Sequence, residues 1–225
     1  MLLLLLLSGF AFADEIATNS GVRPVAHCPD DMAALPGFCI DRYEAPNEKG
    51  TRPFTARGAD EAEAWCNERG KRLCTQKEWI RSCGGARKNR YPYGNVYKRG
   101  VCNDDKPYRA VNWGLVNKFP SEAARRHIDE LNQSDPSGSR PGCVSDDGVY
   151  DLAGNASEWV LRTGKITSGY GYGMMGCYWS GCYNMHKAAG IKAGCEGTLN
   201  AGHPGPAKLF RTYEAGFRCC ATLAP

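Results

Sequence analysis

In residues 59–69 the apolar positions recur every three or four residues, as expected of an amphipathic helix. Acidic residues occupy the first turn, and Gly70 follows the last turn as a stop signal. The apolar residues that fall on one face are Ala59, Ala62, Trp65 and Cys66. We therefore expect a helix over 59–69 that packs this face against the core.

A second helix is marked by its first turn as well as by its apolar face. Thr75-Gln76-Lys77-Glu78 matches a capping box, in which the Thr75 hydroxyl and the Glu78 carboxylate bond free N–H groups at the helix start. Gly84 and Gly85 end the helix. Its buried face is formed by Trp79, Ile80 and Cys83.

A third helix is predicted over 121–132, with Ser121 as its cap. Its apolar stripe consists of Ala124, Ile128 and Leu131. Residues 135–142 are rich in Ser, Pro and Gly, and we expect them to form a surface excursion. The strands that we expect are an edge strand at 37–44 and final strands at 177–183 and 216–221.

The first 13 residues resemble a secretory signal peptide. Six leucines follow Met1, and Ala11-Phe12-Ala13 has the small-residue pattern of a cleavage site. The apolar run is short for a bilayer span, so no stable membrane span is expected after cleavage; a retained lipid-embedded anchor is the alternative. We expect a secreted, periplasmic or extracellular protein with a signal peptide at 1–13, a segment at 14–27 and one domain at 28–222.

Composition narrows the class of protein. The chain has 28 basic and 24 acidic residues and a net charge of +4, which does not favour nucleic-acid binding. Its 27 glycines and 13 prolines indicate a loop-rich fold. All twelve cysteines follow the predicted cut, and this even number is typical of a disulfide framework in an exported protein. Cys28 and Cys39 flank a short loop and are expected to pair.

The stretch 148–159 combines two carboxylates with a flexible turn. Asp151 and Glu158 supply hard oxygen atoms, and Gly154 can adopt a positive φ that turns backbone carbonyls inward. Two interpretations remain open from these residues alone. One is a calcium loop, and the other is a tight turn closed by side-chain to backbone hydrogen bonds.

Several motifs, taken in order, resemble the formylglycine-generating enzyme, or sulfatase-modifying factor, family. The matching stretches are 38–44, 64–66, 70–79, 91–95, 102–103, 148–159 and 216–219. The resemblance implies an α+β, C-type-lectin-like fold that is loop-rich, with short strands and a few helices, and that is stabilised by disulfides.

The resemblance also implies structural calcium. In the stretch 148–159 the ligands would be the side chains of Asp151 and Glu158 and the carbonyls of Gly154 and Ala156. A second calcium site would begin at Asn103 and the carbonyl of Asp104. Calcium at these positions would hold loops that no helix or strand supports.

Two long-range disulfides follow from the same resemblance. Cys66 would pair with Cys219, and Cys74 with Cys220. Active members of the family bind copper(I) through two cysteines five residues apart and oxidise a substrate cysteine to formylglycine. Cys177 and Cys182 have this spacing, and soft thiolates suit copper(I).

The pairing of the remaining cysteines separates two outcomes. If Cys83 pairs with Cys195 and Cys102 pairs with Cys143, then Cys177 and Cys182 are left for copper or for each other. If Cys83 pairs with Cys182 instead, the oxidase hypothesis fails.

Two functions therefore remain as hypotheses, and the sequence favours the first. A non-catalytic binding or assembly module would contact a glycan or an exported protein through aromatic side chains. These side chains are Tyr170, Tyr172, Tyr178 and Trp179. The alternative is a copper-dependent oxidase that acts through Cys177 and Cys182.

Overall fold

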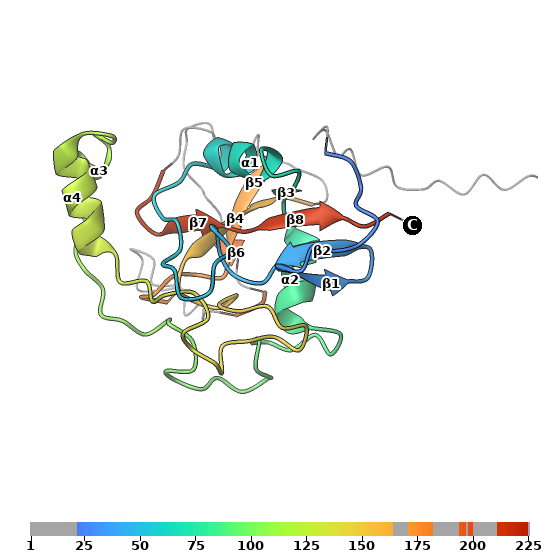
Figure 1. The fold of residues 1–225 in the computed structure, drawn as a ribbon. Coiled ribbons are helices and arrows are strands. Elements are labelled where there is room, and N and C mark those ends of the chain that lie inside the picture. Colours follow the sequence, from blue (N-terminus) through green and yellow to red (C-terminus); the bar gives the residue numbers. More distant parts are fainter. Residues whose placement is uncertain (1–21, 164–170, 182–193, 197, 200–210, 225) are drawn as a thin grey trace, which may run out of the picture.

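The computed structural model describes residues 22–163, 171–181, 194–196, 198–199 and 211–224. Within these residues, two four-stranded sheets and four helices form a loop-rich α+β fold (Figure 1). The strands are β1 Met32–Leu35, β2 Phe38–Asp41, β3 Arg72–Leu73, β4 Ser157–Leu161, β5 Tyr172–Met175, β6 Thr198–Leu199, β7 Ala215–Phe217 and β8 Cys219–Thr222. The helices are α1 Ala59–Asn67, α2 Gln76–Gly84, α3 Trp113–Val116 and α4 Glu122–Leu131.

The first sheet has the strand order β1-β2-β8-β3 and is antiparallel throughout. β1 and β2 form a hairpin in which Gly37 supplies a positive φ of 84°. The expected strand at 37–44 therefore exists as β2, but it is not an edge strand. It pairs with β1 on one side and with β8 on the other, because 32–35 forms a strand that the sequence did not reveal.

The second sheet has the order β6-β5-β4-β7, and β4 and β7 are parallel. The strand expected at 177–183 is displaced, because the chain pairs with β4 through Tyr172–Met175 and then turns. Cys177 lies in this turn with a φ of 60°, and residues 182–183 lie outside the described residues. The final stretch is divided at Arg218, so that β7 belongs to the second sheet and β8 to the first.

The three expected helices are confirmed as α1, α2 and α4. At the start of α2 the Glu78 amide donates to Thr75 Oγ1 over 3.2 Å, and the Thr75 amide donates to Glu78 Oε2 over 2.8 Å. The Ala124 amide donates to Ser121 Oγ at the start of α4. The short helix α3 was not predicted. It pairs with α4 in a hairpin that stands at the left of Figure 1.

Five disulfides among the described residues connect the chain across large sequence separations. They are Cys28–Cys39, Cys66–Cys219, Cys74–Cys220, Cys83–Cys195 and Cys102–Cys143. The first three are the expected pairs, and the last two match the first of the two alternative pairings. In the part of the chain that the structure describes, no helix has the length and apolar character of a membrane span.

Candidate functional site

The oxygen-rich turn runs through the interior of the protein and leads directly into β4. Every residue over 151–160 is buried. Asp151, Gly154 and Asn155 have positive φ angles of 60°, 88° and 59°, which bend the backbone sharply. A Cβ atom at Gly154 would lie 2.4 Å from the carbonyl oxygen of Asn103, so this close approach requires a glycine.

Glu158 is paired with Arg218 in two parallel hydrogen bonds. Arg218 Nε donates to Glu158 Oε2 over 2.7 Å, and Nη2 donates to Oε1 over 2.6 Å. The indole N–H of Trp79 donates to Oε2 over 2.8 Å. The remaining guanidinium N–H groups bond the carbonyls of Asp41, Arg42 and Tyr150. Both oxygens of this buried carboxylate therefore have protein donors.

Glu44 is a second buried carboxylate at the turn. Its Oε2 accepts from Asn155 Nδ2 over 2.7 Å, and its Oε1 accepts from the Ala156 amide over 3.1 Å. Ser137 Oγ also donates to Oε2 over 2.8 Å. Burial, together with the charges of Asp151 and Glu158, raises the pKa of Glu44 well above its usual range. Glu44 therefore closes the turn by hydrogen bonds from both backbone and side chains.

Asp151 lies against a segment that the sequence analysis placed at the surface. The Gly138 amide donates to Asp151 Oδ2 over 2.7 Å, and Ser134 and Ser137 are buried. Burial raises the pKa of Asp151 to about 6, although the Gly138 N–H and the Arg218 charge act in the opposite direction. The expectation of a surface excursion at 135–142 is therefore wrong for Ser137 and Gly138, which are buried and supply donors to two buried carboxylates.

Asn103 links the loop after Cys102 to the turn. Its carbonyl accepts from the Asn155 amide over 2.7 Å, and its Nδ2 donates to Asn155 Oδ1 over 3.0 Å and to the Gln133 carbonyl over 3.1 Å. Its own Oδ1 is buried and accepts no hydrogen bond from any residue that the structure describes. Burial raises the pKa of the neighbouring Asp104 to about 6.

The expected calcium ligands differ in how well they fit an ion. Among the described residues, no group of three or more Asp, Glu, His or Cys side chains is arranged to hold a metal ion. The carboxylate of Glu158 is engaged by Arg218 and Trp79, so it fits a calcium ligand poorly. Asn103 fits better, because its buried Oδ1 lacks a donor.

Of the two expected copper ligands, only Cys177 lies within the described residues. Cys177 is fully buried and is disulfide-bonded. Its partner is not among the ten cysteines paired above, and Cys182 lies outside the described residues. A sulfur in a disulfide is not a thiolate, which is the form that binds copper(I).

Two of the four expected contact aromatics are core residues. Trp179 is 1% exposed and Tyr178 is 4% exposed, and both pack with Tyr213 in one cluster. The Tyr213 hydroxyl donates to the Tyr178 hydroxyl over 3.2 Å. The expectation that these two rings are presented at the surface is therefore wrong. Tyr172 is half-buried, its hydroxyl donates to Glu63 over 2.5 Å, and Tyr170 lies outside the described residues.

The residues that complete this interior network are not among the site residues expected from the sequence. Glu44, Arg218 and Asn155 are all buried and hydrogen-bonded there. A usable signal was present for Arg218. Arg218 follows Phe217 and precedes Cys219 in the last predicted strand, and a charged residue between core residues indicates an internal partner.

The chain matches a known protein family over most of its length. The family model described as "Sulfatase-modifying factor enzyme 1-like domain" matches residues 32–222. Two curated relatives are each named inactive C-alpha-formylglycine-generating enzyme 2. The Bos taurus protein is 33% identical over 106 residues, and the Mus musculus protein is 31% identical over 121 residues. These matches cover 45% and 52% of the chain but only 30% and 34% of the relatives, so the chain matches about a third of their length.

Three solved structures share the fold at low sequence identity. CarF has a TM-score of 0.52 at 14% identity and covers 83% of this chain and 87% of its own. The Treponema denticola variable protein 1 has a TM-score of 0.54 at 14% identity, with coverage of 82% and 84%. PvdO from Pseudomonas aeruginosa has a TM-score of 0.51 at 17% identity, with coverage of 83% and 80%. These likenesses support the fold alone.

Proposed function

Because the chain belongs to the sulfatase-modifying factor enzyme 1-like family, we propose that it is a non-catalytic member, an exported and disulfide-stabilised module that binds a glycan or a protein. The observation that carries this proposal is the state of Cys177, which is buried and bonded in a disulfide. Copper(I) chemistry at this position needs a free thiolate pair. The bovine and murine relatives are themselves named inactive, which supports a non-catalytic function for this chain.

Thiol labelling under non-reducing conditions tests the absence of catalysis. We expect no label on Cys177 or Cys182, no stoichiometric copper(I) uptake, and no oxidation of a cysteine-containing peptide in the presence of oxygen and a reductant. Uptake of one copper(I) that is lost in the Cys177→Ser variant would contradict the proposal. The Cys28→Ser variant is the matched control, because it also frees one thiol but lies in a different bridge.

The oxidase remains a second candidate for one specific reason. Cys83 pairs with Cys195. The Cys83–Cys182 disulfide that would have excluded an oxidase is therefore not formed. Cys177 and Cys182 keep the five-residue spacing of the copper pair. Under this second proposal, mild reduction would open the Cys177 disulfide and create the copper site, and the copper titration above should then be positive only after reduction.

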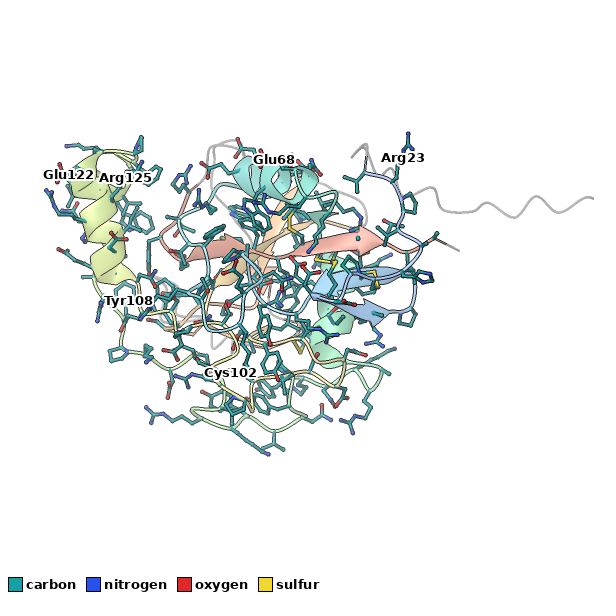
Figure 2. The ribbon with its side chains drawn as sticks, in the orientation of Figure 1. Arg23, Glu68, Cys102, Tyr108, Glu122 and Arg125 are labelled. Carbon is teal, nitrogen blue, oxygen red and sulfur yellow. A yellow bond between two sulfur atoms is a disulfide. The ribbon has the colours of Figure 1, made fainter. Side chains whose placement is uncertain are left out.

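For the binding function, we propose an aromatic surface beside α1 in place of the buried Tyr178 and Trp179. Tyr172, Trp65 and Phe54 are half-buried and pack against the same core cluster, so none of the three side chains is fully enclosed. Phe54 and Trp65 meet edge to face, with ring centroids 5.9 Å apart. A glycan array and a pull-down should show reduced binding for Trp65→Ala and Tyr172→Ala. Tyr108→Ala is the matched control, because Tyr108 is 40% exposed and lies away from this surface (Figure 2).

A structural calcium ion is proposed at Asn103 and Asp104 rather than at Glu158. The support is the buried Asn103 Oδ1 without a donor, which an ion would satisfy. Calcium bound only by the folded state would raise the melting temperature, and the rise grows with the logarithm of the calcium concentration divided by the dissociation constant. We expect the wild type to melt higher in calcium than in chelator, and Asn103→Ala to lose this difference. Equal melting temperatures of the wild type in both conditions would remove calcium from the proposal.

A further inference from the structure

The segment between α2 and Cys102 carries an unusual concentration of positive charge. Residues 86–100 contain five basic side chains and no acidic one, although the whole chain has almost balanced charges. We call these five residues the basic rim, which consists of Arg87, Lys88, Arg90, Lys98 and Arg99. The five side chains are all exposed. In Figure 1 this segment forms the lower edge of the body, and Figure 2 shows nitrogen-tipped side chains along that edge near Cys102.

Only part of this charge is neutralised by the protein itself. Arg87 pairs with Asp146, and Arg99 pairs with Asp105. Lys88, Arg90 and Lys98 form no ion pair with any described residue. Three exposed cations therefore face solvent on one short segment, and no carboxylate of the segment opposes an incoming anion.

The segment is held in place at both ends and in the middle. Cys83 precedes it and is bonded to Cys195, and Cys102 follows it and is bonded to Cys143. Between them, the Tyr91 and Tyr93 rings stack with centroids 5.5 Å apart, and Tyr97 lies 5.7 Å from Tyr91. A rigid array of charges loses little conformational entropy when a ligand binds, which favours affinity.

We propose that the basic rim binds an acidic polysaccharide, a chain with repeated sulfate or carboxylate groups. Disulfide-rich proteins mature in oxidising compartments, where acidic polysaccharides are a main class of linear polyanion. The three tyrosines of the segment pack on one another, so they are not free as stacking platforms for nucleic-acid bases. Val96, which is 71% exposed, is the only large apolar side chain that the segment exposes, and one such residue does not make a membrane anchor.

An acidic polysaccharide is a glycan, so the proposal names a ligand class within the proposed function but places it on the basic rim instead of on the aromatic surface beside α1. The two can fail independently, because each is tested by its own variants.

The test compares two triple variants with the same loss of charge. Lys88→Ser/Arg90→Ser/Lys98→Ser removes the unpaired cations of the basic rim. Arg23→Ser/Lys118→Ser/Arg126→Ser removes three exposed cations elsewhere. The probe is dextran sulfate, with neutral dextran as the reference. We expect the wild type to bind dextran sulfate but not dextran, with an affinity that falls as salt is added.

The rim variant should bind dextran sulfate about tenfold more weakly or worse, and the control variant should bind like the wild type. Circular dichroism and melting temperature must match the wild type for both variants, and the folded state is expected to tolerate these exposed changes. Equal losses in both variants would overturn the proposal, because net charge alone would then explain binding. Stronger binding to phosphatidylglycerol vesicles or to single-stranded DNA than to dextran sulfate would overturn it in favour of those partners.

Discussion

Arg218 lies between β7 and β8, the point where the chain passes from one sheet to the other. From this position it donates two hydrogen bonds to Glu158 on β4 and further bonds to three backbone carbonyls. Arg218 and Glu158 are both about 1% exposed in their side chains. A buried charge of this kind is stable only while its partner is present, because desolvation costs several kcal/mol for each ion.

Replacing Arg218 tests this dependence. Arg218→Met should destabilise the protein by about 3–5 kcal/mol, because Glu158 would remain buried without its partner. Arg218→Lys should lose part of that amount, since a lysine keeps the charge but not the two-pronged geometry. The measurement is the free energy of unfolding in urea with the disulfides intact.

The matched control for this prediction is Arg87→Met. Arg87 also pairs with a carboxylate, that of Asp146, but its side chain is 70% exposed. An exposed pair of this kind contributes about 0–1 kcal/mol. A loss for Arg218→Met as small as the loss for Arg87→Met would show that the interior pair is not needed for stability.

Glu214 gives a prediction for the dependence of stability on pH. Burial raises its pKa from 4.5 to about 7, although the Thr212 hydroxyl donates to its carboxylate and acts in the opposite direction. The unfolded chain ionises Glu214 above about pH 4.5, whereas the folded state keeps the proton until about pH 7. Its contribution to stability is therefore fully present below pH 4.5 and is lost as the pH rises through 7.

Glu214→Gln should remove this pH dependence and raise the free energy of unfolding at pH 8 by about 3 kcal/mol relative to the wild type. Glu68→Gln, at an exposed side chain, should leave the pH profile unchanged. Unfolding curves recorded between pH 4 and pH 8 give both values. If Glu214→Gln were less stable than the wild type at pH 8, the assignment of a raised pKa would be wrong.

At the scale of elements, the helices were predictable because their signals are local. The Thr75–Glu78 capping box and the Ser121 cap involve residues three positions apart, and both form as expected. Two features of the strands were not predictable from local signals. One is β1 as the hairpin partner of β2, and the other is the position of β5 at 172–175 instead of the expected 177–183. Strand pairing is decided by contacts with other strands, and the sequence pattern of a four-residue strand is too short to specify them.

The turn before β4 depends on the absence of a side chain at Gly154. Gly154→Ala should destabilise the protein by about 2–4 kcal/mol, because the new Cβ would lie 2.4 Å from the Asn103 carbonyl and the φ of 88° is strained for alanine. Gly171→Ala is the control, since a Cβ there meets no atom within 4 Å. Urea unfolding of both variants checks the difference, and similar losses would mean that the close approach to Asn103 relaxes at low cost.

At the scale of the whole molecule, two disulfides bind the early helices to the last strand. Cys66–Cys219 spans 153 residues and Cys74–Cys220 spans 146 residues. The two loops overlap almost completely, because Cys66 and Cys74 are eight residues apart and Cys219 and Cys220 are adjacent. While either bridge is intact, the other therefore closes a loop of only about ten residues. The unfolded chain is therefore restricted mainly by the first bridge, and the second adds the smaller contribution of a short loop.

This arrangement predicts strongly unequal losses. Removing either bridge by a double Cys→Ala change should cost about 3 kcal/mol, whereas removing both should cost about 7 kcal/mol, because with Cys83–Cys195 still closed the second removal opens a loop of about 40 residues. The Cys28–Cys39 bridge, with a separation of 11, should cost about 3 kcal/mol by itself and should add independently. Unfolding under non-reducing conditions measures each value. If the loss for both bridges equalled twice the loss for one, the two overlapping loops would act independently, which contradicts this prediction.

The sequence by itself determined the family, the three main helices and three of the disulfides. Helix periodicity and caps are local, and the ordered motifs and the cysteines within them imply the fold and these pairs. The presence of two carboxylates in the turn at 148–159 was also visible, but their partners were not.

Only the tertiary structure decided which groups meet those carboxylates. Glu158 meets an arginine 60 residues away, and Glu44 meets an asparagine 111 residues away. The tertiary structure also places Trp179 in the core, pairs Cys83 with Cys195, and buries Ser137 and Gly138. These outcomes depend on which distant side chains are desolvated together, and the cost of burying a charge depends on that complete arrangement rather than on any local pattern.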